Sequence, residues 1–308
     1  FSVLDRCSTA MGSRYLKRNI LFPLVNLNKI NKRLDTIEAL NKYQVLLKDL
    51  HTNLNEIYDL ERIVGRISYG SASPKDLIQL RNSLSVLPNI IALLSKPKNA
   101  ILNELANKIN PFTELHDLLQ RSINDDAPYL LRDGNIIKPG FNDELDKIKN
   151  IGKTNKDFLI NLEKEERERT GIKTLKVGFN KVFGYYIEVT KSYLSQIKDE
   201  FGYIRKQTTS NSERFITQDL KEKETSILRS EEISLELEIK LFNDIRNVCK
   251  ENLMKLQHVA SIISEIDMLH SLSLVATENN YVRPTFSLYD EMYIEEGRHP
   301  VIETFGNV

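Results

Sequence analysis

The sequence has few cysteines and lacks the glycine-rich motif of many nucleotide-binding proteins. Only two cysteines occur among 308 residues, and there is no GxxxxGK[ST] motif. Cys7 and Cys249 lie far apart and in no recognised pattern, so we expect two reduced thiols in a cytosolic protein. Without the glycine-rich motif, these residues carry no nucleotide site of the phosphate-loop type.

An excess of charge, long apolar runs and metal-ligand spacings are missing as well. The chain has 43 basic and 43 acidic residues, and this balance permits a local basic patch, because acidic segments elsewhere cancel it. No apolar run approaches the roughly 20 residues that span a bilayer, so we predict no membrane partner. The five histidines are scattered and no nucleophile accompanies a base, so the residues indicate neither a metal site nor an enzyme.

Helical spacing dominates the first half of the sequence. Over Leu24–Leu47, apolar residues recur at steps of mostly three, four or seven, which predicts one face of an amphipathic helix. Ser73 before Pro74 predicts a helix start, with serine as the N-cap and proline at the first helical position. Another helix is predicted over Asp143–Thr170, and Gly171 suits a left-handed cap at its end.

The second half contains 80 successive residues, Tyr203–Val282, without glycine or proline. A helix of about 55 residues within it would be roughly 80 Å long. We predict that one helix leads outward, a β segment forms its tip and this longer helix returns beside the first. Ten apolar residues of the longer helix step by three or four, as in a coiled-coil seam: Leu235, Ile239, Phe242, Ile245, Cys249, Leu253, Leu256, Ala260, Ile263 and Ile266.

Residues 173–215 differ in composition from the helices on either side. VGFNKVFGYYIEV has two glycines, four aromatic residues and alternating β-branched residues, which predicts two strands joined by residues 180–184. Gly184 is expected to adopt a positive φ in that loop. Eight basic and four acidic residues from Lys173 to Arg214 give this insert a charge of +4.

The residues alone leave two interpretations of this basic tip. Arg205 and Lys206 stand beside the hydroxyl and amide side chains of residues 207–211. This mixture suits a phosphate backbone, because cations neutralise phosphates while hydroxyls and amides donate single hydrogen bonds. An ordinary polar loop fits the small charge count equally well. The aromatic side chains are predicted to form a small core of the tip rather than to stack on bases.

Five stretches of the sequence resemble motifs of the MutS family of DNA mismatch-repair proteins. They are LDRCSTAMGSRYLKRNILFPL, DLERIVGRISYGSASPKDLIQLRNSL, EERERTGIKTLKVGFNKVFGYYIEVTK, RKQTTSNSERFITQDLKEKE and EEGRHPVIE. The resemblance covers essentially all 308 residues, and the last three stretches together are quite specific. The family's mismatch-reading segment and the phosphate loop of its ATPase domain have no counterpart in these residues, so we expect a fragment of a longer chain.

The resemblance implies a mainly α fold with a helical core, long antiparallel lever helices and a small β-rich clamp inserted at their tip. The expected core covers residues 1–140, and the lever helices cover 141–172 and 216–280. The clamp is expected at 173–215, and the start of the ATPase domain at 281–308.

By the same resemblance, the clamp would grip the backbone of double-stranded DNA non-specifically, and the levers would transmit ATP-driven movement to it. The matching segments imply seven DNA-binding residues: Arg205, Lys206, Thr208, Thr209, Ser210, Asn211 and Lys181. No catalytic residue, metal or cofactor is expected in this fragment. The full-length protein is expected to be an ATPase that uses ATP and Mg²⁺.

The resemblance also implies a dimer, a MutL-type repair partner, and a place in the bacterial cytoplasm at the nucleoid, or in the nucleus or an organelle of a eukaryote. A different class of function stays open, namely a structural coiled-coil scaffold whose long helices bind a protein partner. Affinity for DNA separates these two hypotheses.

Overall fold

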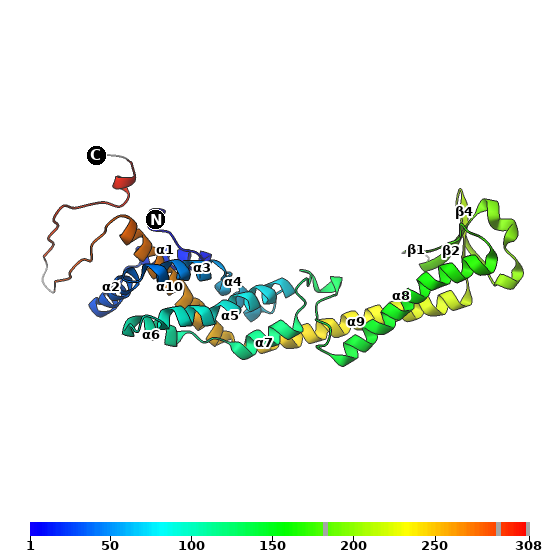
Figure 1. Ribbon diagram of the computed structural model, residues 1–308, viewed down its shortest axis with the longest axis horizontal. Coiled ribbons are helices and arrows are strands. Elements are labelled where there is room, and N and C mark those ends of the chain that lie inside the picture. The colour runs from blue at the N-terminus through cyan, green and yellow to red at the C-terminus, as the bar shows by residue number, and fades with distance from the viewer. Residues whose placement is uncertain (181–183, 288–290, 306–308) are drawn as a thin grey trace. The chain divides into compact units, whose positions relative to one another are not determined.

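A computed structural model of the chain describes residues 1–180, 184–287 and 291–305 (Figure 1). The fold is mainly α, with one small antiparallel sheet inserted between helices, as predicted. The chain forms two compact units. The first combines Phe1–Leu131 with Phe242–Val308, and the second is Arg132–Leu241.

The first unit is a helical core built around its last long helix. α10 (Leu253–Glu278) is the central helix, because α1, α2, α3, α4 and α6 all pack against it. Its apolar side chains point in all directions, as expected for a helix that is buried on every side. The other helices are α1 (Ala10–Leu21), α2 (Leu27–Asn41), α3 (Gln44–Asn55), α4 (Leu60–Tyr69), α5 (Pro74–Ser95), α6 (Ala100–Lys108), α7 (Thr113–Ser122) and the end of α9 (Gln218–Glu251).

Two of these helices, α5 and α10, are long and apolar enough to cross a membrane by length and composition alone. Neither helix is an uninterrupted apolar run, because polar residues are scattered along both, although their average hydropathy is high. Half of the apolar window of α5 and 72% of that of α10 are buried inside the protein. Packing in the helical core therefore accounts for the apolar character of both helices.

The long helix predicted after the sheet is divided at Asn252 into α9 and α10. The backbone N–H of Asn252 donates to the Cys249 carbonyl, and its side-chain amide donates to the Val248 carbonyl (3.0 Å). Both bonds satisfy carbonyl groups of the last turn of α9, as is usual at the end of a helix. Leu253, beside the break, is only half-buried. From Leu256 onward the predicted seam packs against several helices, so this part is the centre of a core and not a two-stranded coiled coil.

Two further predictions concern helix ends. The Ser73 hydroxyl accepts from the Asp76 N–H, and the Asp76 carboxylate accepts from the Ser73 N–H, a capping box that confirms the predicted start of α5. The single helix predicted over Leu24–Leu47 is wrong, because α2 ends at Asn41. The N–H of Tyr43 bonds back to an α2 carbonyl three residues earlier, which makes a tight turn before α3.

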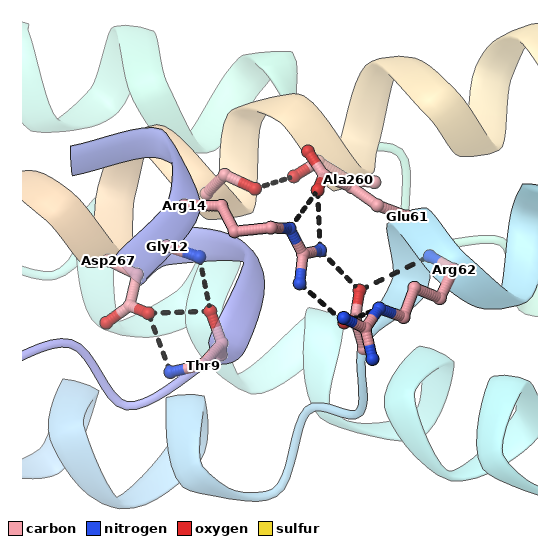
Figure 2. A network of polar contacts seen from close by, with 9 residues as sticks. Thr9, Gly12, Arg14, Glu61, Arg62, Ala260 and Asp267 are labelled. Carbon is pink, nitrogen blue, oxygen red and sulfur yellow. Dashed lines mark hydrogen bonds and ion pairs between the residues drawn. The ribbon is translucent and has the colours of Figure 1, made fainter. Parts of the chain in front are cut away.

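A buried carboxylate fastens the N-terminal segment to α10 (Figure 2). Asp267 accepts hydrogen bonds from the Ser8 N–H (2.9 Å), the Thr9 N–H (2.8 Å) and the Thr9 hydroxyl (2.6 Å). The Thr9 hydroxyl in turn accepts from the Gly12 N–H (2.9 Å), which caps α1. One carboxylate thereby fixes both the segment before α1 and the position of the α1 cap.

His270, also in α10, gives the first unit a predicted dependence on pH. Its Nε2 lies 3.0 Å from the Leu47 carbonyl oxygen, and burial lowers the pKa of His270 to about 4. An unfolded histidine has a pKa near 6.5, so between these values the unfolded chain binds more protons and acidification favours unfolding. We expect the unfolding free energy to fall by up to about 3 kcal/mol as the pH drops through this window, measured by urea denaturation.

Asp267 has the opposite effect on the unfolding free energy in acid. Burial raises its pKa, so the folded state binds a proton at Asp267 at a higher pH than the unfolded chain does. A His270→Gln variant isolates the contribution of the histidine, since glutamine does not titrate. Between neutral pH and the pKa of His270, the unfolding free energy of this variant should change less than that of the parent protein. If the unfolding free energies of the parent and of His270→Gln depend equally on pH, His270 is not the source of the pH dependence.

The second unit contains α8 (Asp143–Thr170), most of α9 and the sheet. The strands are β1 (Lys176–Asn180), β2 (Gly184–Thr190), β3 (Ile204–Thr208) and β4 (Ser212–Ile216), in the antiparallel order β1-β2-β4-β3. The predicted helix over 143–170 is confirmed, and Gly171 caps it with φ 74°. Short 3₁₀ helices lie at Leu131–Asp133, Lys191–Gln196, Asp199–Phe201 and Ile302–Phe305.

This unit has an apolar core of its own. In the unit, α8 and α9 run side by side, and the sheet lies at one end of the pair (Figure 1). The sheet packs onto both helices through a cluster of buried side chains: Leu162, Ile172, Leu175, Ile187, Val189, Phe215, Leu220 and Ile227. The small sheet is therefore positioned by its own packing onto the two helices.

Candidate nucleic-acid interface

β1 and β2 form the hairpin that the sequence predicts. Asn180 pairs with Gly184, and Gly184 adopts φ 77° as expected. Lys181, one of the predicted DNA-binding residues, lies outside the described residues. Because Thr190 at the far end of β2 pairs with Ser212, the turn between β3 and β4 lies at the opposite end of the sheet from the Asn180–Gly184 pair.

The aromatic side chains of the hairpin are divided between the two faces of the sheet. Tyr185 packs against the buried cluster. The ring of Phe179 contacts the ring of Tyr185, with 4.8 Å between the two centroids. Tyr186 lies on the other face over Gly178, where an added Cβ would come within 2.8 Å of the ring. The predicted small aromatic core is therefore confirmed for Tyr185, while Tyr186 belongs to the outer face.

Arg214 connects three strands on this outer face. Its guanidinium lies 4.2 Å from the centroid of the Tyr186 ring, a cation–π contact. Its Nε donates to Glu188 of β2 (2.8 Å), and its Nη1 donates to the side-chain oxygen of Gln207 in β3 (2.9 Å). Arg214 thus holds the edge strand β3 to the rest of the sheet.

The edge strand β3 contains a β-bulge at Lys206. Arg205 pairs with Phe215 and Gln207 pairs with Arg214, so Lys206 is the extra residue between two successive pairs. A bulge redirects a side chain away from the regular alternation of the strand. Lys206 is exposed, and within the described part of the chain it has no ion pair or side-chain hydrogen bond.

The turn from β3 to β4 presents hydroxyl and amide groups. Thr208, Ser210 and Asn211 are exposed. Thr209 is half-buried, and its hydroxyl donates to the Ser212 carbonyl (3.0 Å) and accepts from the Ser212 N–H (3.0 Å). Three of the four predicted turn residues therefore face solvent, while the hydroxyl of Thr209 shapes the turn.

Lys191 joins this surface, although the sequence motifs did not single it out. Its backbone N–H donates to the Asn211 carbonyl (3.1 Å), which places it beside the turn. Its side chain is exposed and, among the residues that the structure describes, has no ionic partner. Lys191 begins the first of two short helices, and these helices and β3 lie between it and Asn211 in the chain. Only the pairing of β2 with β4 brings Lys191 and Asn211 together.

Arg205, predicted as a DNA contact, already has a partner. Its Nε lies 2.8 Å from Oε2 of Glu213, an ion pair without hydrogen-bond geometry, and the Glu213 side chain is only 8% exposed. Arg205 lies opposite Phe215, and Glu213 precedes Phe215 by two residues, so the ion pair is on the face of the sheet that carries the apolar core.

Glu166 of α8 fixes the segment that leads into β3. It accepts hydrogen bonds from the Tyr203 hydroxyl (2.5 Å) and from Nη2 of Arg169 (2.7 Å). The Arg169 guanidinium also lies over the Phe201 and Tyr203 rings. Burial and the Glu166 carboxylate raise the pKa of Tyr203, which stays a neutral hydrogen-bond donor. The start of the bulged strand is therefore anchored to a helix.

Five exposed residues gather along the bulge and the turn, and we call them the tip surface: Lys191, Lys206, Thr208, Ser210 and Asn211. They offer cations and neutral hydrogen-bond donors and no carboxylate. Such groups suit phosphate oxygens. In the described ranges, no group of three or more His, Cys, Asp or Glu side chains could hold a metal ion.

The chain is similar in sequence to a known protein family and to several bacterial proteins. Residues 1–273 match the family model described as MutS domain III. The DNA mismatch repair protein MutS of Geobacillus sp. (strain WCH70) is 46% identical over 98% of this chain. The proteins of the same name from Caldicellulosiruptor saccharolyticus and Caldanaerobacter subterraneus are 44% and 46% identical over 98% and 99% of this chain. The chain spans 35% of the length of each of these relatives.

Proposed function

The chain belongs to the MutS family of DNA mismatch-repair proteins, and from this premise we propose that its sheet grips the backbone of double-stranded DNA. The contacts would be to phosphates and would not depend on base sequence. α8 and α9, on which the sheet is packed, would act as the levers that carry ATP-driven movement to it. Gripping and movement would then be linked through the apolar cluster beneath the sheet.

The bulged Lys206 is the observation that carries this proposal. A regular edge strand would keep the alternation of side chains, whereas the bulge exposes one unpaired cation beside a turn of hydroxyl and amide groups. Lys206, Thr208, Ser210 and Asn211 would contact phosphate oxygens, with Lys191 as a further cation. Lys181, the other predicted cation, follows Asn180 in the sequence, at the end of the sheet opposite this turn, and would be a separate contact. Thr209 would act through the shape of the turn, and Arg205 has a separate role, argued below.

The proposal extends to parts of the relatives that this chain does not cover. The division into core, levers, clamp and the start of an ATPase domain, inferred from the sequence, is part of it, with α10 belonging to the core and not to the lever expected over 216–280. ATP with Mg²⁺, a dimer and a MutL-type partner would belong to the whole protein, and the described part of this chain would act without cofactor or catalysis.

A protein-binding scaffold made of long helices is the competing function. The structure makes α10 the centre of a multihelix core, which leaves less of the predicted seam available to a partner. The scaffold hypothesis gives no reason for an unpaired lysine on a bulge. DNA binding therefore has the stronger structural support.

Lys206→Glu provides the direct test. We expect it to weaken binding of the chain to duplex DNA by roughly tenfold at moderate salt and to lower the slope of log K against log salt by about 1 to 2. The loss should be the same for duplexes of unrelated sequence, because phosphate contacts carry no sequence information. Fluorescence anisotropy over a salt series measures both quantities.

Lys48→Glu is the matched control, because it makes the same change of charge at an exposed position of α3 in the helical core. Its affinity should stay close to that of the parent. If Lys206→Glu binds duplex as tightly as Lys48→Glu, the tip surface does not contact DNA and the scaffold hypothesis prevails.

A further inference from the structure

We infer that Glu213 withdraws Arg205 from phosphate binding, so that lysines supply the cationic contacts of the tip surface. The inference rests on the proposed function and adds a residue that limits the strength of the grip. The sequence alone predicts that Arg205 and Lys206 both bind DNA, whereas the structure distinguishes these two neighbours.

The geometry separates these two neighbours. Arg205 keeps the regular register of β3 and lies on the core side of the sheet, where its Nε is 2.8 Å from Oε2 of Glu213. Lys206 is the extra residue of the bulge and has no ionic partner in the described part of the chain. The bulge therefore divides adjacent cations into one that is paired and one that faces solvent.

Burial decides which partner Arg205 keeps. The side chain of Glu213 is 8% exposed, whereas that of Arg205 is 63% exposed. If Arg205 moved to a phosphate, Glu213 would be left charged, buried and without its counter-ion, which is strongly unfavourable. A phosphate contact at an exposed surface is screened by salt and offers less in return. The pair with Glu213 therefore persists when DNA is near.

The second arginine of the sheet follows the same rule. Arg214 donates to Glu188 and to Gln207 and lies over the Tyr186 ring. Both arginines of β3 and β4 thus have a carboxylate partner on a neighbouring strand. Lys191 and Lys206 have no such partner among the described residues, so the unpaired charge of the tip surface resides on lysines.

The ion pair has a consequence for affinity. A paired arginine and glutamate add no net charge, so they release no counter-ions from DNA and contribute nothing to the salt dependence of binding. The carboxylate also repels nearby phosphates. Neutralising Glu213 should therefore strengthen DNA binding, although Glu213 itself touches no DNA.

A rival arrangement makes the opposite prediction. The Nη groups of Arg205 are not required by Glu213, and the carboxylate could orient the guanidinium toward a phosphate. In that case the loss of Glu213 would weaken binding, and the loss of the whole pair would weaken it as much as the loss of Lys206.

The experiment measures binding of the 308-residue chain to a labelled duplex over a salt series, for four variants and the parent. Glu213→Gln should bind several-fold more tightly, with a log–log salt slope steeper by about 0.9. Lys206→Gln should bind several-fold more weakly, with a slope shallower by about 0.9. The double variant Arg205→Gln/Glu213→Gln, which keeps the net charge, should stay within about twofold of the parent with an unchanged slope.

Glu200→Gln controls for the change in net charge, because it neutralises an exposed carboxylate of the same unit that is paired with Lys198. Its effect should be smaller than that of Glu213→Gln. Circular dichroism and melting curves confirm that each variant is folded, and the double variant tests the inference even where Glu213→Gln alone unfolds the sheet.

The outcomes separate the inference from the proposed function. Equal losses in the double variant and in Lys206→Gln would overturn the inference and leave the clamp intact. Equal gains in Glu213→Gln and Glu200→Gln would do the same, since the effect would then be one of general charge. If Lys206→Gln binds like the parent, the proposed function fails and the inference fails with it.

Discussion

Replacing Gly12 with alanine is expected to lower the melting temperature of the helical core by roughly 10 °C. This is the reverse of the usual effect, because alanine inside a helix normally stabilises it by about 1 kcal/mol relative to glycine. A Cβ at position 12 would lie 2.1 Å from Oδ2 and 2.8 Å from Cβ of Asp267. The contact therefore involves the base of the side chain as well as its tip, and Asp267 must shift.

A shift of Asp267 releases the hydrogen bonds that it accepts from Ser8 and Thr9. The N–H and hydroxyl donors and the carboxylate are largely buried, so leaving them unpaired costs about 3–5 kcal/mol. For a unit of this size each kcal/mol lowers the melting temperature by about 2–4 °C. Differential scanning calorimetry measures the change.

Gly65→Ala is the matched control, because Gly65 lies inside helix α4 and an added Cβ there meets nothing within 4 Å. This variant should melt at the parent temperature or slightly above it. In a double-mutant cycle, the variant that combines Gly12→Ala with Asp267→Ala should be destabilised by less than the sum of the two single changes, since the second change removes the carboxyl group that makes the shortest contacts with the added Cβ. A Gly12→Ala protein as stable as Gly65→Ala would refute this account.

The second large effect is expected for Glu238→Ala in α9, which should destabilise the second unit by about 3–5 kcal/mol. Glu238 is 2% exposed. Its Oε1 accepts from the backbone N–H groups of Ile136 (3.1 Å) and Ile137 (3.2 Å) and from Nζ of Lys149 (2.6 Å). Removing the carboxylate leaves one cation and two backbone donors without their acceptor.

The measurement is amide hydrogen exchange, which should accelerate at least about tenfold at Ile136 and Ile137, in parallel with a lower melting temperature. Glu236→Ala is the control, because Glu236 is exposed on the same helix and has the same helical propensity. Equal protection of Ile136 and Ile137 in the two variants would show that another group holds this segment.

A count of charged residues does not locate the excess positive charge of the insert. Counting residues gives the insert a charge of +4, but three of its four acidic residues form ion pairs with basic residues of the same unit: Glu188 with Arg214, Glu200 with Lys198 and Glu213 with Arg205. The excess charge is therefore located on residues that counting cannot identify. The register of β3 and β4 decides which cations remain unpaired.

Local signals in the sequence were reliable wherever one or two residues decide the backbone. Ser73 starts α5, and Gly171 ends α8 with a positive φ. Gly184 closes the predicted hairpin. Each of these depends on hydrogen bonds and dihedral angles within a few residues, so the residue type is sufficient to predict them. The family motifs likewise depend on short stretches, and they indicate the MutS family without reference to the fold.

The sequence by itself determined the mainly α fold, the β insert, several helix ends and the family, because each is written in local composition or in short motifs. The tertiary structure alone decided that α10 is a core helix, that Asp267 holds Ser8 and Thr9, and that Glu213 holds Arg205. These contacts join segments that are distant in the chain or set by strand register. Burial and pairing of a charge depend on what the fold places beside it, and the residue type alone carries no record of that neighbour.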